Sequence, residues 1–185
     1  MTWQIPQSKT ETSAATPVVN LDAGGEDVFV GSDVTLAATQ YYAIRGSGSG
    51  HAALIYGTVA SQGGFSTIVL GNSSFVDSGQ SVTIEAGGHV QGLDYTAVFV
   101  DGFASTVVNK GLVSALGATG VVMQGDQVGT TSTLTNAGTI EATGFYGVFL
   151  SGSETMSHPI AVSFPVEPYL STAAPASTRS PTPAP

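Results

Sequence analysis

The sequence predicts an all-β chain folded as a parallel β-helix (β-solenoid) of about five coils. Three observations favour this class. Glycine is abundant and charge is scarce, with 24 glycines in 185 residues and only 9% of residues charged. Short segments alternate between aliphatic and polar residues with the period of two that is typical of strands. Similar segments recur at intervals of 23 to 31 residues, and recurrence at such intervals indicates a repeat architecture.

The repeat is clearest in two seventeen-residue segments, NKGLVSALGATGVVMQG (109–125) and NAGTIEATGFYGVFLSG (136–152). Earlier and fainter units close at Gly102, Gly71 and Gly46. Glycine and Asn-x-Gly separate the short strands within each unit, and these residues accept the backbone angles of tight corners. A single unit cannot bury its apolar face, whereas stacked units share one continuous core.

The alignment of the units also predicts which side chains stack. Residues at equivalent positions are expected to form columns: Val98, Val121 and Val148 inward; Val100, Met123 and Leu150 inward; Phe99, Val122 and Phe149 outward; and Asn109 with Asn136 at a corner. The outward column would be a contact surface or, as we favour, a ladder that stabilises neighbouring coils. A β-sandwich of hairpins is the alternative fold, but only Asp101-Gly102 offers a hairpin turn, and its flanks are unequal.

Composition divides the chain into three regions. Every glycine lies between Gly24 and Gly152, and seven of the nine prolines follow Gly152. We therefore expect an extended, disordered leader at 1–23, a solenoid domain at 24–152 and a low-complexity Pro/Ser/Thr/Ala tail at 153–185.

Charge and composition exclude several kinds of protein. The net charge is −9, and the four basic residues, Lys9, Arg45, Lys110 and Arg179, are scattered, so we expect no nucleic-acid partner. The absence of cysteine excludes disulfides and thiolate sites. No apolar run approaches the roughly 18 residues of a membrane span, so no membrane insertion is expected. The first residues lack the basic and apolar regions of a Sec signal peptide.

The carboxylates do not align. Asp101 aligns with Gln124 and Ser151, Glu141 with Ser114 and Gln91, and Asp94 with Gly117 and Gly144. Acid–base catalysis on a solenoid face needs carboxylates close together. We therefore expect no catalytic residues and no enzyme.

The remaining motifs are weak. His51, His89 and His158 lack metal-ligand spacing and are expected to be isolated surface residues. Gly46–Gly50 is expected to be a flexible bend, and Asn72–Ser74 to be a chance glycosylation sequon. The stretch AGGEDVFVGSD (Ala23–Asp33) is similar to one Ca²⁺-binding nonapeptide, but it lacks the third glycine and has no second copy. We expect no cofactor and no metal, with Ca²⁺ as the alternative.

The pattern N-x-G-x-[IV]-x-A-x-G-x-x-G-V-x-[LM]-x-G resembles the β-solenoid region of large secreted bacterial proteins. These are autotransporter passengers and the N-terminal parts of RTX haemolysin-type calcium-binding proteins, and the resemblance covers residues 24–152. In the RTX proteins, tandem nonapeptides and a type I secretion signal follow the solenoid. Here Pro-rich sequence begins at Ser153, and our hypothesis is a truncated or frame-shifted member.

These observations predict a non-catalytic structural or adhesin-like repeat protein that is secreted by a bacterium or carried on its surface. Its partners would be a polysaccharide or a protein surface, and the open end of the solenoid would allow self-association. The alternatives are an RTX-type calcium-binding protein without its nonapeptide region and a polysaccharide-active β-helix enzyme.

Overall fold

The chain folds into stacked short strands, as the sequence predicts. The computed structural model describes residues 2–22, 24–72, 76–125, 130–152, 154–157 and 162–163, with their side chains as far as Ser151. Over these residues there are strands and no helix. The strands form three parallel sheets. The prediction of an all-β parallel β-helix is therefore confirmed.

Each sheet takes every third strand of the chain. Sheet A consists of β1 (Thr2–Gln4), β4 (Glu26–Val30), β7 (Ala52–Ile55), β10 (Ser81–Ile84), β13 (Thr106–Asn109), β16 (Ser132–Asn136) and β19 (Glu154–Ser157). Sheet B consists of β2 (Lys9–Glu11), β5 (Thr35–Ala38), β8 (Thr58–Ser61), β11 (His89–Gly92), β14 (Leu112–Ala115), β17 (Thr139–Ala142) and β20 (Val162–Ser163). Sheet C consists of β3 (Val19–Leu21), β6 (Ile44–Gly46), β9 (Ile68–Leu70), β12 (Val98–Asp101), β15 (Val121–Gly125) and β18 (Val148–Gly152).

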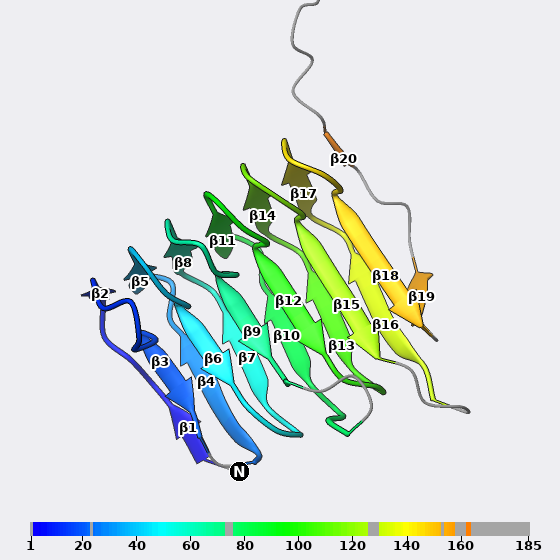
Figure 1. Cartoon of the computed structure of the whole chain (residues 1–185), viewed down its shortest axis with the longest axis horizontal. Coiled ribbons are helices and arrows are strands. Elements are labelled where there is room, and N and C mark those ends of the chain that lie inside the picture. Colours follow the sequence, from blue (N-terminus) through cyan, green and yellow to red (C-terminus); the bar gives the residue numbers. More distant parts are fainter. Residues whose placement is uncertain are drawn as a thin grey trace, which may run out of the picture.

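One strand from each sheet makes a coil, so that coil 1 is β1–β3 and coil 6 is β16–β18. The molecule is a solenoid of about six turns, close to the five predicted. Figure 1 shows the coils side by side along the long axis, with β1–β3 at one end and β19 and β20 at the other. Consecutive coils pair strand to strand in all three sheets, so backbone hydrogen bonds run along the axis and side chains point into the interior or outward.

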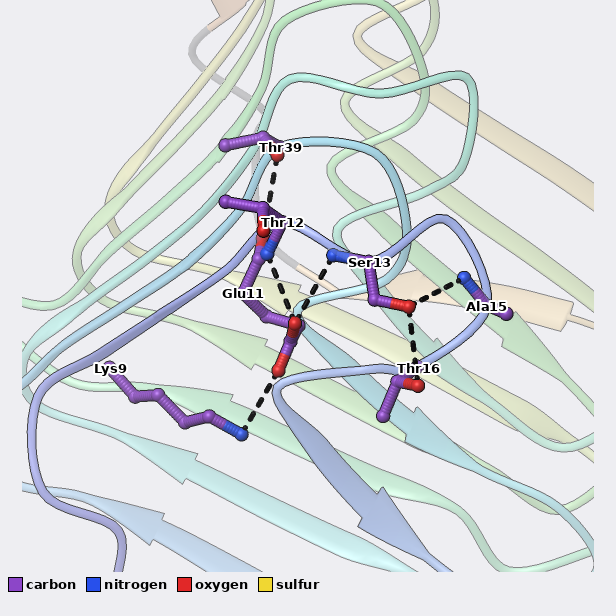
Figure 2. A network of polar contacts seen from close by, with 7 residues as sticks. All are labelled: Lys9, Glu11, Thr12, Ser13, Ala15, Thr16 and Thr39. Carbon is purple, nitrogen blue, oxygen red and sulfur yellow. Dashed lines mark hydrogen bonds and ion pairs between the residues drawn. The ribbon is translucent and has the colours of Figure 1, made fainter.

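The additional coil lies in the segment expected to be a leader. Strands β1, β2 and β3 pair in parallel with β4, β5 and β6, so the solenoid begins before the predicted boundary at residue 24. Local polar contacts shape this coil between sheets B and C (Figure 2). One carboxylate oxygen of Glu11 accepts hydrogen bonds from the backbone N–H groups of Thr12 and Ser13, both at 3.1 Å, and the other lies 3.3 Å from Lys9 Nζ.

The same contacts explain why polar sequence folds here. The Ser13 N–H and the Lys9 ammonium hold the pKa of Glu11 below its ordinary value, because both stabilise the carboxylate. Ser13 Oγ then accepts the backbone N–H of Ala15 and donates to Thr16 Oγ1 at 3.3 Å. The Glu11 carbonyl oxygen accepts the N–H of Thr39 in the next coil at 2.9 Å. Side chains thus satisfy a corner that carries few apolar residues.

The predicted inward columns are confirmed. Register pairs Val98 with Val121 and Val121 with Val148, and it pairs Val100, Met123 and Leu150 in the same way. The first two residues of each column are buried, and Val148 and Leu150 in coil 6 are partly buried against the same core. Equivalent aliphatic columns from sheets A and B complete one dry interior. Its burial is the main driving force for the fold.

The predicted asparagine pair is also confirmed. Asn109 Nδ2 donates to Asn136 Oδ1 at 2.7 Å, and both side chains are buried. Asn109 Nδ2 also donates to the Thr139 carbonyl oxygen, while Asn109 Oδ1 accepts the N–H of Gly111. The two amides therefore satisfy the backbone groups of the corner between sheets A and B, as buried polar groups require.

Besides the asparagine pair, a column of buried polar residues runs along the interior where the sheet A strands begin. The N–H of His51 donates to Gln80 Oε1, the N–H of Gln80 to Ser105 Oγ, and the N–H of Ser105 to Ser132 Oγ, at 3.1 to 3.2 Å. All four side chains are buried. Each coil thus satisfies a backbone donor of the preceding coil at the corner between sheets C and A.

The predicted low-complexity tail, 153–185, lies almost wholly outside the described residues. Two segments within it are described, β19 and β20, which pair with β16 and β17 and so continue sheets A and B. None of the described residues forms a helix of the length and apolarity that crossing a bilayer requires.

Candidate functional site

The corner between sheets B and C carries aromatic side chains that are exposed or half-buried. Tyr41 and Tyr42 precede β6, Phe65 precedes β9, and Tyr95 precedes β12. Tyr41, Phe65 and Tyr95 each stand three residues ahead of their sheet C strand, so they occupy equivalent corner positions of coils 2, 3 and 4. We call these four residues the aromatic corner.

A surface groove lies beside the aromatic corner. Its volume is about 310 Å³, and it is lined by Tyr42, Gly64, Phe65, Ser66, Val69, Tyr95 and Phe99. Val69 and Phe99 are paired in register on adjacent strands of sheet C, and their side chains point away from the core. The floor of the groove is therefore the outer face of sheet C, and its wall includes Tyr42, Phe65 and Tyr95 of the aromatic corner.

Ring contacts fix part of the wall. Phe65 packs edge-on against Tyr41 and Tyr42, with ring centroids 4.9 and 5.0 Å apart, and the two tyrosine rings lie 4.4 Å apart. Such edge-to-face arrangements are favourable. Tyr95 is 50% exposed and Phe65 is 38% exposed, so both rings present a face or an edge to solvent. Ring packing therefore orders the part of the wall that Tyr42 and Phe65 form, and the wall remains accessible.

Burial and a nearby cation act in opposite directions on the Tyr42 phenol. Partial burial raises the pKa of Tyr42 above its ordinary value, Tyr41 adds to this effect, and Arg45 opposes it. The guanidinium carbon of Arg45 lies 5.8 Å from the centre of the Tyr42 ring, within the range of a cation–π contact. Tyr42 is therefore held as a neutral phenol, which can both donate and accept a hydrogen bond at the edge of the groove.

The outward column predicted from the sequence has the expected register but an uneven surface. Phe99 pairs with Val122 and Val122 with Phe149. Phe99 lines the groove, Val122 is only 9% exposed, and Phe149 is 44% exposed. The middle of the column is therefore buried, whereas its Phe99 end faces the groove and its Phe149 end faces solvent.

The carboxylates predicted to lie in separate columns do so. Asp101 pairs in register with Gln124, which pairs with Ser151, and Glu141 pairs with Ser114. A Cβ atom added to Gly117 would meet the backbone of Asp94, as stacking of these two residues requires. Across the described part of the chain, no three His, Asp or Glu side chains gather in a group that could hold a metal ion.

Two histidines lie in the described residues, and one differs from its prediction. His51 is completely buried rather than on the surface, and its ring nitrogens lie 2.9 Å from the carbonyl oxygens of Glu26 and Ser47. The ring fits because position 46 is glycine: a Cβ there would approach it to 3.0 Å. His89 is partly buried on sheet B, and His158 lies outside the described residues.

From Gly24 onward, the stretch similar to a calcium nonapeptide is part of the solenoid. Gly25, with φ of 75°, makes the turn into β4. The Asp27 carboxylate is buried and accepts the backbone N–H of Ala52 at 2.9 Å, whereas Asp33 is exposed. Gly46–Gly50 links β6 to β7, and of the sequon only Asn72 is among the described residues.

Sequence reasoning missed the aromatic corner, although a signal was present. Aligning the units on the first residue of each sheet C strand, rather than on the closing glycine, places Tyr41, Phe65 and Tyr95 in one column. The same alignment places Ala118 in coil 5 and Phe145 in coil 6. The column of aromatic residues is thus interrupted by Ala118 in coil 5. The groove is lined by residues of coils 2 to 4.

Comparisons with known proteins identify no relative: no protein-family model, no curated protein and no solved structure matches the chain.

Proposed function

We propose that this chain is a non-catalytic structural or adhesin-like module that acts outside the cell or on its surface. The observation that carries the proposal is an exposed aromatic groove on a rigid, hydrogen-bonded rod. Exposed aromatic clusters on otherwise regular surfaces mark sites of contact. The rod would serve to hold this groove away from whatever anchors the chain.

The resemblance to secreted bacterial solenoids supports the same proposal. A β-solenoid region is what autotransporter passengers and the N-terminal parts of RTX proteins have in common. The low fraction of charged residues and the glycine-rich corners are compatible with both of these protein classes. We propose a secreted, bacterial origin because of this resemblance. Because folds of this kind serve many functions, the groove supports a binding role more directly than the fold does.

Surface plasmon resonance tests the proposal. The folded chain is passed over immobilised polysaccharides and immobilised extracellular proteins, and we expect saturable binding to at least one of these surfaces. The same polysaccharides are then incubated with the chain and assayed for new reducing ends, which we expect not to form. Binding to none of the surfaces, or steady release of reducing ends, would overturn the proposal.

Calorimetric titration with CaCl₂ separates this proposal from a calcium-binding function. We expect no saturable heat up to millimolar Ca²⁺. Saturable heat that is lost in Asp27→Asn would instead support the RTX-type alternative, because Asp27 is the buried carboxylate of the nonapeptide-like stretch.

A further inference from the structure

The shape and lining of the groove beside the aromatic corner favour one class of ligand. The inference of this ligand rests on the proposed binding function. Tyr42 comes from coil 2, Phe65 and Val69 from coil 3, and Tyr95 and Phe99 from coil 4. Two coil spacings correspond to roughly 10 Å along the axis. The groove therefore accommodates a small segment of a longer ligand, and its volume lies near the lower end of ligand sites.

The floor of the groove offers a ligand no sheet edge. Strand β9 pairs with β6 on one side and with β12 on the other, so its backbone groups are engaged along the axis. An extended peptide binds a sheet by adding a strand at an edge, which this face does not provide. A peptide lying on Val69 and Phe99 would instead leave its own backbone groups facing apolar side chains. The floor thus disfavours extended peptides.

The lining of the groove offers an ionic ligand no charged partner, although Arg45 pairs in register with Val69 beside it. None of its lining residues is an acid or a base, and the only titratable groups among them are the phenols of Tyr42 and Tyr95. Of the described basic side chains, Lys9 and Lys110 form ion pairs with carboxylates, and Arg45 is engaged in a cation–π contact with Tyr42. The chain carries a net charge of −9, which repels polyanions over the Debye length.

An uncharged ligand with an apolar face and polar edges therefore matches the lining best. A pyranose ring has this character, because its C–H groups line one face and its hydroxyls project around the rim. The face would pack on the aromatic rings, and the hydroxyls would reach water, the phenols of Tyr42 and Tyr95, and the hydroxyl of Ser66. We propose that the groove between coils 2 and 4 binds a segment of an uncharged glycan chain through its sugar rings.

Glycan titrations of the full chain test the inference. Isothermal calorimetry with cellohexaose, xylohexaose, maltohexaose, chitohexaose and hexagalacturonate provides four uncharged ligands and one acidic ligand. We expect saturable binding of at least one uncharged hexasaccharide. Tyr95→Ala should weaken that binding about tenfold, the effect of losing one stacked ring. Tyr95 is half exposed, so its removal should leave the core and the circular dichroism spectrum unchanged.

Matched variants distinguish the effect of altering the groove from the effect of removing any exposed aromatic ring. Phe65→Ala, which removes a second wall residue, should also weaken binding. Tyr146→Ala and Tyr56→Ala should bind like the parent chain, since these exposed tyrosines (58% and 38%) lie outside the groove lining. Tyr146 is the closest control, because it lies at the same corner in coil 6.

Several outcomes would overturn the inference. These are binding of hexagalacturonate alone, no binding of any uncharged hexasaccharide, and equal binding by the parent chain and Tyr95→Ala. Binding to an immobilised protein that Tyr95→Ala leaves unchanged would refute the glycan site while leaving the proposed binding function intact. Release of reducing ends would refute the proposed function, whether or not the groove binds sugar.

Discussion

Glycine at the corner between sheets A and B is required by the packing of neighbouring coils. A Cβ atom added to Gly111 would lie 2.2 Å from the carbonyl oxygen of Gly88 and 2.6 Å from that of Glu85. Both contacts are to backbone atoms, so no side-chain rotation relieves them. We expect Gly111→Ala to lower the free energy of unfolding by about 3 kcal/mol or more, measured by urea denaturation.

Gly31→Ala is the matched control for this prediction. The nearest atoms to a Cβ at Gly31 are side-chain carbons 3.7 Å away, which is ordinary van der Waals contact. Restricting the unfolded chain should then stabilise the protein slightly, by about 0.4–1 kcal/mol. Equal destabilisation by the two substitutions would show that close coil contact is not the reason for glycine at position 111.

Partial burial of His89 makes stability depend on pH. Burial lowers the pKa of His89 below its ordinary value of 6.5, and Glu141 partly opposes this shift. Its Nε2 atom is buried without a hydrogen-bond partner among the described residues, so the neutral ring is the form that the fold favours. The unfolded chain therefore takes up a proton at higher pH than the folded chain does. The stability gained from neutral His89 is present above pH 6.5 and is lost as pH falls through the lowered pKa.

We expect His89→Gln to reduce this loss. The free energy of unfolding is measured by urea denaturation at intervals from about pH 8 to pH 5, for the parent chain and the variant. His51 and the carboxylates are common to both proteins, so the difference between the two curves isolates His89. Parallel curves over this range would contradict the prediction.

At the scale of strands, the sequence predicts the interior better than the ends. The columns of Val98 and Val100 follow from a period of two and a clear alignment of units, because a one-residue error in register would turn every aliphatic side chain outward. Coil 1 was missed because β1 and β2 are mostly exposed and polar. Hydrogen bonds such as those of Glu11 satisfy the corner of this coil, so that it forms with little apolar sequence.

The aromatic groove was missed for a different physical reason. Its residues come from three coils, and the interval between equivalent positions changes from 24 residues, Tyr41 to Phe65, to 30 residues, Phe65 to Tyr95. The longer interval reflects the long connection between β9 and β10 at another corner. Spacing along the chain therefore does not reveal the groove, whereas strand register does.

The open edge expected at the last repeat is confined to one sheet within the described structure. Strands β16 and β17 are followed by β19 and β20, whereas β18 is the last strand of sheet C over the described residues. Alternate N–H groups of β18 consequently lack a strand partner there. We expect amide hydrogen exchange in Val148–Leu150 to be faster than in Val121–Met123, which are flanked by strands on both sides. Equal protection, measured by NMR, would show that β18 is also covered.

At the scale of the molecule, the solenoid behaves as a one-dimensional stack. Each coil contacts the coils before and after it, so its stability is approximately a sum of coil and interface terms. A whole coil should therefore be removable wherever the junction restores the register. Asn109 and Asn136 occupy equivalent positions in adjacent coils. Deletion of residues 109–135 joins Val108 directly to Asn136, which then takes the place of Asn109.

We expect this deletion to give a folded, shorter solenoid of lower stability, with the circular dichroism of a β protein and a cooperative urea transition. Coils 2 to 4 are retained, so its affinity for the uncharged glycan should equal that of the parent chain. Deletion of residues 109–122 is the control, because it places Met123 after Val108 and brings sheet C sequence into sheet A. That variant should lose the cooperative transition, since the inward columns and the Asn109 corner no longer align. If the in-register deletion unfolds while the control folds, coil register does not govern this structure.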